Sequence, residues 1–263
     1  MGSATTQALA ASIETLAAAK GVTLDTAREL FAAARAVSES PQLSGALADP
    51  SAPAEARQSV VSAVFGGYSA AARSVLTSAV AERWSNSDQL IDGIEELAIR
   101  AATIAEPGAD IEGELFGFSR VIAANAELEL ALGSRLGGED AKGVLVERLL
   151  AEAGTSAPAA LIVTSLVRLP RERRVRQLLS RAMRIVSSQR DRIVATVHSA
   201  SPLSEAQRTR LSDALSRRYG GTVALNVVID PAVVGGLRVQ IADDVIDGSI
   251  SARLADLRQK LVS

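Results

Sequence analysis

The chain has 263 residues with no cysteine and a single histidine, His198, so disulfides, thiolate metal sites, cysteine nucleophiles and histidine-rich metal sites are excluded. Apolar residues make up 48% of the chain and aromatic residues only 3%, which predicts cores of Ala, Leu, Val and Ile between closely packed helices. Charge is distributed unevenly: residues 1–110 hold 13 acidic and 7 basic residues, whereas 168–263 hold 9 acidic and 17 basic ones. Such asymmetry is typical of a protein that has a docking face or binds an acidic partner.

The sequence predicts neither export nor membrane insertion. The opening "MGSATTQALAASIETLAAAKG" lacks the basic segment of a secretory signal. The longest apolar stretch, "PAALIVTSLV" at 158–167, is much shorter than the ~20 residues that span a bilayer. We therefore expect a soluble, cytoplasmic protein.

Helical spacing of apolar residues dominates the first 190 positions. A first helix is expected at 5–20, with an apolar stripe that stops at Gly21. Thr23 is placed to cap a second helix, and Pro41 ends it. Three more helices follow: one from Pro53 to Gly66, one capped by Ser69, and one near 87–105.

The helical pattern repeats. "ELFAAARAVSESPQLSGAL" begins at Glu29 and "ELFGFSRVIAANAELELAL" at Glu114, and seven of the nineteen positions are identical at this offset of 85. Residues of about 111–190 thus form a second helical unit. That unit lacks its own counterpart of the 5–20 helix, and the 87–105 helix stands in its place. We expect the 87–105 helix to close the first bundle and open the second.

From residue 191 the pattern changes to a β-α-β-β-α order. "DRIVATVHSA" and "TVALNVVID" predict strands around a helix that begins with the capping pattern Ser204-x-x-Gln207. "GLRVQIA" predicts a third strand, "DVIDGS" a short continuation of it, and Ser249 caps a final helix. The glycines of this region are expected to serve turns and close backbone approach, with no phosphate-binding pattern around them. The structural motif comprises Asp230, Pro231, Gly235, Gly236, Asp247, Gly248 and Ser249.

An arginine-rich segment at 168–192 is the strongest charge signal, with nine arginines opposed by Glu172 and Asp191. Three interpretations stay open: the solvated face of a long helix, a docking face for an acidic protein, and a nucleic-acid surface. No aromatic residue lies among the arginines, so the base stacking used by single-strand binders is missing.

No constellation for catalysis is evident. The adjacent carboxylates Glu95-Glu96 and Asp243-Asp244 diverge on a helix or a strand, so neither pair forms a convergent acid–base dyad. His198 is interpreted as an ordinary strand residue and Trp84 as a packing residue. The sequence predicts no catalytic residue, no metal site and no cofactor.

The closing region carries a specific family likeness. "RDRIVATVHSA", "SPLSEAQ" and "DPAVVGGLRVQIADDVIDGSISARLADL" resemble the C-terminal part of the F-type ATP synthase delta subunit (oligomycin-sensitivity-conferring protein) family. The likeness covers 111–263, because the second helical unit resembles the six-helix domain of that family. Residues 1–105 resemble a second copy of this domain, as in a long form of the subunit.

The resemblance implies a mainly α protein with a small α+β C-terminal domain. The implied domains are a duplicated helical bundle at 1–105, a bundle resembling the family's N-terminal domain at 106–190, and a stalk-binding α+β domain at 191–263. Two other classes remain as alternatives: a helical-repeat scaffold or adaptor, and a nucleic-acid-binding α+β protein.

The function implied by the resemblance is that of a non-catalytic stator subunit in the peripheral stalk. Such a subunit links the alpha/beta catalytic head of a proton-translocating ATP synthase to the b subunits and resists rotational torque. The implied partners are the N-termini of the alpha subunits and the C-terminal helices of b, without nucleic acid or direct membrane insertion. The implied location is the cytoplasmic face of the bacterial plasma membrane, as a peripheral protein.

In this family the alpha-subunit groove lies between the first and fifth helices of the bundle, so the repeat offers two grooves. One lies between 5–20 and 69–84, where the N-terminal helix is more open. The other lies between 87–105 and 157–168; we favour it because it is contiguous with the C-terminal module. The candidate contact residues are Leu9, Ile13, Leu16, Leu76, Val80, Ile91, Ile94, Leu161 and Leu166.

Overall fold

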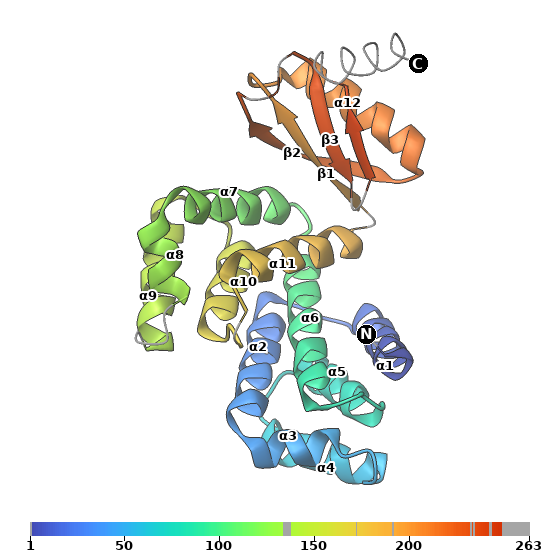
Figure 1. Ribbon diagram of the computed structural model, residues 1–263. Coiled ribbons are helices and arrows are strands. Elements are labelled where there is room, and N and C mark those ends of the chain that lie inside the picture. The colour runs from blue at the N-terminus through green and yellow to red at the C-terminus, as the bar shows by residue number, and fades with distance from the viewer. Residues whose placement is uncertain are drawn as a thin grey trace, which may run out of the picture. The chain divides into compact units, whose positions relative to one another are not determined.

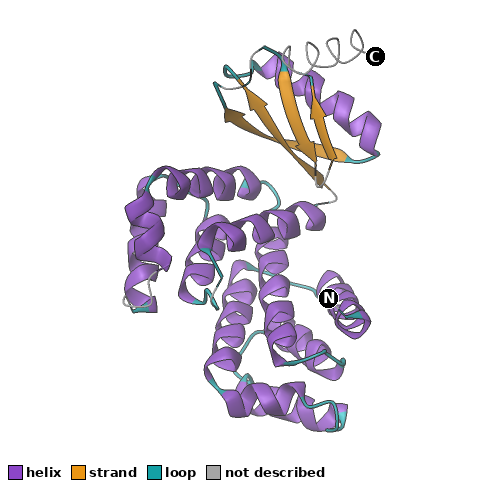
Figure 2. Cartoon of the chain, in the orientation of Figure 1, coloured by secondary structure: helices purple, strands orange, loops and turns teal. Residues whose placement is uncertain are grey.

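The computed structural model describes residues 2–133, 138–171, 173–190, 192–231, 233, 235–241 and 244–248. The chain divides into two compact units, Met1–Val186 and Ser187–Ser263. The first is helical and the second combines strands with a helix, which confirms the predicted fold class (Figure 2).

The helical unit follows the predicted order, with one addition (Figure 1). Pro41, which the sequence indicates as a stop, also begins a short helix, because proline fits the first helical turn and Ser40 caps it by accepting from the Leu43 amide at 3.2 Å. The helices are α1 (Ser3–Ala18), α2 (Leu24–Glu39), α3 (Pro41–Ala48), α4 (Ala54–Val64), α5 (Ala70–Ala81), α6 (Ser87–Ala105), α7 (Ile111–Ala124), α8 (Ala126–Gly133), α9 (Glu139–Glu152), α10 (Ala157–Arg168) and α11 (Val175–Gln189).

The helix bounds repeat along the chain. Moving α3 by 85 positions gives the bounds of α8, and the same shift places α2 over α7 and α1 over α6. Helices α5 and α10 are both 12 residues long and begin 87 positions apart, at Ala70 and Ala157. The two added positions arise because α9 is three residues longer than α4, whereas the link after it is one residue shorter. Helix α6 thus holds the last place in one series and the first place in the next.

One polar clamp recurs with the helices. The carboxylate of Glu29 on α2 accepts from the amide (3.0 Å) and the hydroxyl (2.6 Å) of Ser69, which caps α5. Glu114 on α7 accepts from the amide of Ser156 at 3.0 Å and also from its hydroxyl, at the start of α10. In both places a negative charge meets the positive end of a helix, which stabilises the helix start.

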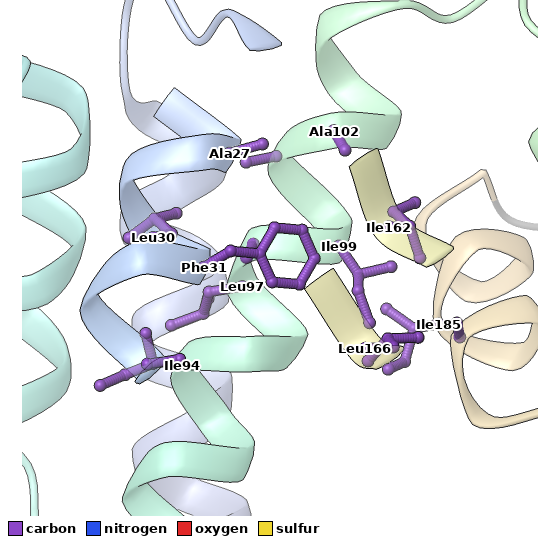
Figure 3. Packing of buried hydrophobic residues seen from close by; sticks show 14 of the residues in the cluster. Ala27, Leu30, Phe31, Ile94, Leu97, Ile99, Ala102, Ile162, Leu166 and Ile185 are labelled. Atoms are coloured by element: carbon purple, nitrogen blue, oxygen red, sulfur yellow. The ribbon is translucent and has the colours of Figure 1, made fainter. Parts of the chain in front are cut away.

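The helical unit has one continuous hydrophobic core. Helix α6 runs through its middle and packs against α1, α2, α3, α5 and α10 (Figure 1). In Figure 3, Phe31 of α2 points toward Ile99 of α6. Ile162 and Leu166 of α10 lie on the side of Ile99 away from Phe31. Small side chains such as Ala27 and Ala102 let the helices approach closely, as the alanine-rich composition predicts.

The second unit is a four-stranded sheet with the order β2-β1-β3-β4. Strand β1 pairs in parallel with β2, and β3 pairs antiparallel with both β1 and β4. Within "DVIDGS", residues Asp244–Asp247 therefore form a separate antiparallel strand, β4, and the prediction of a continuation of β3 was wrong. The bounds are β1 (Arg192–Ser199), α12 (Glu205–Tyr219), β2 (Thr222–Ile229), β3 (Leu237–Ile241) and β4 (Asp244–Asp247).

Helix α12 covers one face of this sheet (Figure 2). It begins with the predicted capping box, in which Ser204 accepts from the Gln207 amide at 3.3 Å while Gln207 accepts from the Ser204 amide at 2.9 Å. It ends at Gly220, whose φ of 74° is the left-handed conformation that favours glycine. Leu215 packs with Ala195, Val197, Val223, Val239 and Ile241 in a core separate from that of the helical unit.

Candidate partner-binding surfaces

Three arginines of the basic segment point into the helical unit. Arg171 contacts Asp88 and Asp92 of α6, each at 2.7 Å. Arg173 lies 3.1 Å and Arg181 2.6 Å from Glu95, whose side chain is only 3% exposed. None of the three interpretations drawn from the sequence (a solvated face, a docking face and a nucleic-acid surface) included these partners within the chain. The ion pairs hold the link before α11, and α11 itself, against α6.

Burial raises the pKa of Glu95, although Arg173 and then Arg181 act in the opposite direction. The neighbouring Glu96 accepts from Arg100 at 2.8 Å and lies 3.6 Å from Arg181. The adjacent carboxylates Glu95 and Glu96 are therefore both engaged with arginines, and Arg181 lies near both of them.

Helices α1 and α5 are in contact, and small side chains lie along the outer side of that contact. Thr15 and Ser78 are hydrogen-bonded at 2.9 Å where the helices touch. Ala11 lies one turn before Thr15 on α1, and Ser74 one turn before Ser78 on α5, so these four share the outer side of the contact. Of the predicted contact residues, Leu16, Leu76 and Val80 lie in the core, and Leu9 and Ile13 are partly buried beside it.

The groove between α6 and α10 borders α2. Ile91, Ile94 and Leu166 are core residues, whereas Leu161 is partly buried. Leu161 and Phe31 line a cavity of about 520 Å³ between α10 and α2. Its charged lining residues are Arg28, Arg35, Arg168, Glu95 and Glu147. The second predicted groove is therefore partly occupied by a helix of this chain.

A further cavity of about 620 Å³ lies among α7, α8, α9 and the link to α10. We call it the α7–α9 groove. No sequence pattern had indicated it, because its apolar residues are spaced like those of any helix face. Its apolar lining includes Phe118, Val121, Leu128, Leu145, Leu149 and Leu150.

The structural motif of the C-terminal module forms turns. The Asp230 amide donates to the Ser199 carbonyl at 2.8 Å, and the Asp230 carbonyl accepts from the Val233 amide at 3.1 Å, which closes a turn with Pro231 as its second residue. Gly235 and Gly236 have φ of 62° and 88°, which other residues rarely adopt. The Gly248 amide donates to the Leu237 carbonyl at 2.8 Å after Asp247 ends β4. Ser249 and the helix predicted after it lie outside the described residues.

Trp84 and His198, interpreted from the sequence as a packing residue and a strand residue, contact other parts of the chain. Trp84 is buried in the link after α5, and its indole N–H donates to the Ala79 carbonyl at 2.7 Å. His198 Nδ1 lies 3.6 Å from an Asp230 carboxylate oxygen at the end of the sheet. Asp243 lies outside the described residues. Within the described part of the chain, no group of three metal-ligating side chains converges, and no helix is long and apolar enough to cross a membrane.

Residues 98–261 match the family model described as ATP synthase delta (OSCP) subunit. The ATP synthase subunit delta of Leifsonia xyli subsp. xyli is 46% identical, covering 99% of this chain and 99% of its own. The same subunit of Streptomyces avermitilis is 39% identical over 90% of this chain and 88% of its own, and that of Nocardia farcinica is 38% identical over 94% and 93%. The family model begins within α6, whereas these relatives also match much of the preceding bundle.

Proposed function

The chain belongs to the ATP synthase delta (OSCP) subunit family, a component of the peripheral stalk, and we propose on this premise that it links the alpha/beta head to the b subunits and resists rotational torque. The identity of 46% over 99% of the chain to an ATP synthase subunit delta carries this proposal. In this role the chain is non-catalytic and needs no cofactor. It acts as a peripheral protein at the cytoplasmic face of the bacterial membrane.

The ion pairs of the arginine-rich segment favour this role over nucleic-acid binding. Phosphate neutralisation requires cations that face solvent. Arg171, Arg173 and Arg181 instead contact carboxylates of α6, and Arg176 contacts Glu129 at 2.9 Å. Much of the positive charge that favoured a nucleic-acid surface is thus used within the helical unit.

The N-terminal helix of an alpha subunit is proposed to dock on the outer side of the α1–α5 contact. The small residues Ala11, Thr15, Ser74 and Ser78 on that side allow close approach of an incoming amphipathic helix that carries larger side chains. The α6–α10 groove, which the sequence favours, borders α2 and retains only the cavity between Phe31 and Leu161. Burial of two or three aliphatic side chains, at about 1.5–3 kcal/mol each, supports useful affinity.

Three tryptophan variants test this assignment, since a bulky side chain obstructs the groove that contains it. Ala11→Trp places a ring on the outer side of the α1–α5 contact, and Ala160→Trp fills the cavity between α2 and α10. Ala17→Trp is the control, because Ala17 is exposed on another face of α1. Binding of an alpha N-terminal peptide is measured by calorimetry against each full-length variant.

We expect Ala11→Trp alone to weaken binding, by tenfold or more (about 1.4 kcal/mol). Loss of binding only in Ala160→Trp would place the alpha helix in the α6–α10 groove. Wild-type affinity in both groove variants would contradict docking at either groove while leaving family membership untouched.

A further inference from the structure

The α7–α9 groove is an open apolar surface on the helical unit. Val121 on α7 and Leu145 on α9 both line it, and their exposed fractions are 48% and 41%. The described residues expose seven large apolar side chains in all, and four of them lie on these three helices: Val121, Leu130, Val144 and Leu145. Two of these four, Val121 and Leu145, line the cavity, and exposed apolar side chains at a cavity are typical of an interaction site.

The first bundle has the same helices but fills the corresponding place. The link before α5 there reads Gly66-Gly67-Tyr68-Ser69, whereas the link before α10 reads Ala153-Gly154-Thr155-Ser156. At the offset of 87 set by α5 and α10, Thr155 is the counterpart of Tyr68. The repeat thus replaces a large ring by a small side chain, and Thr155 lines the groove.

The surroundings of Tyr68 show what its ring does in the first bundle. The ring centroid lies 5.2 Å from that of Phe65, and Tyr68 packs against the helical core. Burial, followed by the nearby Glu29 carboxylate, raises the pKa of the Tyr68 phenol. Glu29 is the counterpart of Glu114, which lines the groove. The ring of Tyr68 therefore stands beside Glu29 where the second bundle has open space beside Glu114.

The charge around the groove indicates its occupant. Both charged lining residues, Glu114 and Glu127, are acidic, and residues 111–167 hold eight acidic against four basic residues. An apolar trough with an acidic rim complements a helix that carries aliphatic side chains on one face and lysine or arginine at its flank. The cavity between α2 and α10, by contrast, is lined by three arginines and two glutamates.

We propose that the α7–α9 groove is a second docking site, which binds an amphipathic helix with basic flanks from a partner protein. Aliphatic side chains of that helix enter the space beside Thr155, and its basic residues face Glu127. The site lies on helices other than α1 and α5, and it does not depend on where the alpha subunit docks.

A pair of labelled peptides tests the proposal on the full-length chain. One is a helical peptide of about five turns with leucine at helical spacing and lysine elsewhere. The other has glutamate in place of every lysine. Fluorescence anisotropy gives the affinity, and methyl NMR shows whether the resonances of Val121 and Leu145 shift.

Thr155→Tyr restores the ring of the first bundle and should weaken binding of the lysine peptide tenfold or more, with the melting temperature unchanged or raised. Ala63→Tyr on the exposed side of α4 is the matched control and should bind as the wild type does. Glu127→Lys leaves the apolar lining intact. It should weaken the lysine peptide and strengthen the glutamate peptide.

Several results would overturn the proposal. Equal binding of the two peptides would exclude the acidic rim as a determinant. Wild-type affinity in Thr155→Tyr, or methyl shifts confined to other helices, would exclude the groove. A concentration-dependent dimer that Thr155→Tyr abolishes would assign the groove to a second copy of the chain and not to a partner helix.

Discussion

At the scale of single residues, Arg181 is notable because it contacts two buried carboxylates. It lies 2.6 Å from Glu95 and 3.6 Å from Glu96, both almost fully buried. Buried carboxylates are costly unless a cation and further hydrogen bonds accompany them. Arg173 shares Glu95 and Arg100 shares Glu96, so each carboxylate has two basic neighbours. This network fixes the position of α11 along α6.

Arg181→Met should therefore destabilise the protein at neutral pH, by about 2–3 kcal/mol, because Glu95 loses one of its cations while it stays buried. Chemical denaturation measures the change. Arg184→Met is the matched control, since Arg184 is exposed on the same helix, and we expect a change within about 0.5 kcal/mol.

The penalty of Arg181→Met should shrink as the pH falls. The raised pKa of Glu95 means that the folded state holds the proton above the ordinary value of 4.5. The contribution of Glu95 itself to stability is thus fully present below that value and is lost as the pH rises through the folded pKa. Once Glu95 is protonated it needs no counter-charge. A penalty that stays constant as the pH falls from neutrality to the ordinary value of 4.5 would contradict this account.

At the scale of elements, α6 is the helix that both bundles share. Nearly all of its residues from Leu90 to Thr103 are buried, because helices of both series surround it. The exposed face of an ordinary surface helix is missing here. Its N-terminal half approaches Trp84 so closely that Gly93 has no room for a side chain, since a β-carbon there would overlap the indole ring.

Gly93→Ala should destabilise the protein by about 1–3 kcal/mol through overpacking against Trp84. Gly117→Ala on α7 is the control, because a β-carbon at Gly117 meets nothing within 4 Å. That substitution should stabilise the chain by about 0.5–1 kcal/mol, the usual gain when alanine replaces glycine inside a helix. Thermal unfolding distinguishes the two, and a neutral Gly93→Ala would mean that the Trp84 ring moves aside freely.

Periodicity and capping residues predict most of the helices, because these signals are local. The start of α12 at its Ser204 cap follows the sequence pattern directly. Long-range contacts leave no local signal. The arginines near residue 171 have partners about 80 positions earlier, and the α7–α9 groove arises where Thr155 stands in the place of a tyrosine. Pro41 is compatible both with the end of a helix and with the first turn of another, and the structure shows both, because α2 ends before it and α3 begins at it.

At the scale of the whole molecule, the two separate cores suit the two binding roles proposed for the chain, one at the head and one at the stalk. The helical unit and the sheet unit each bury their own apolar cluster, and the core of the sheet unit draws on residues from 195 onward. The proposed stator role needs such a division, because in that role one chain holds the head and the stalk at the same time. Each unit can then keep its own binding surface without help from the core of the other.

A chain that ends at Arg190 should fold and keep its head-binding function, since truncation there leaves α11 complete and removes the whole sheet. Its affinity for an alpha N-terminal peptide should match that of the full chain within about threefold, or ~0.7 kcal/mol. Its affinity for the C-terminal helices of b should be lost, because the 191–263 module is proposed to hold them. The Ala11→Trp full-length variant gives the reciprocal control, with b binding retained and alpha binding weakened. Unchanged b binding by the truncated chain would assign the stalk-binding site to the helical unit, with the α7–α9 groove as the first candidate.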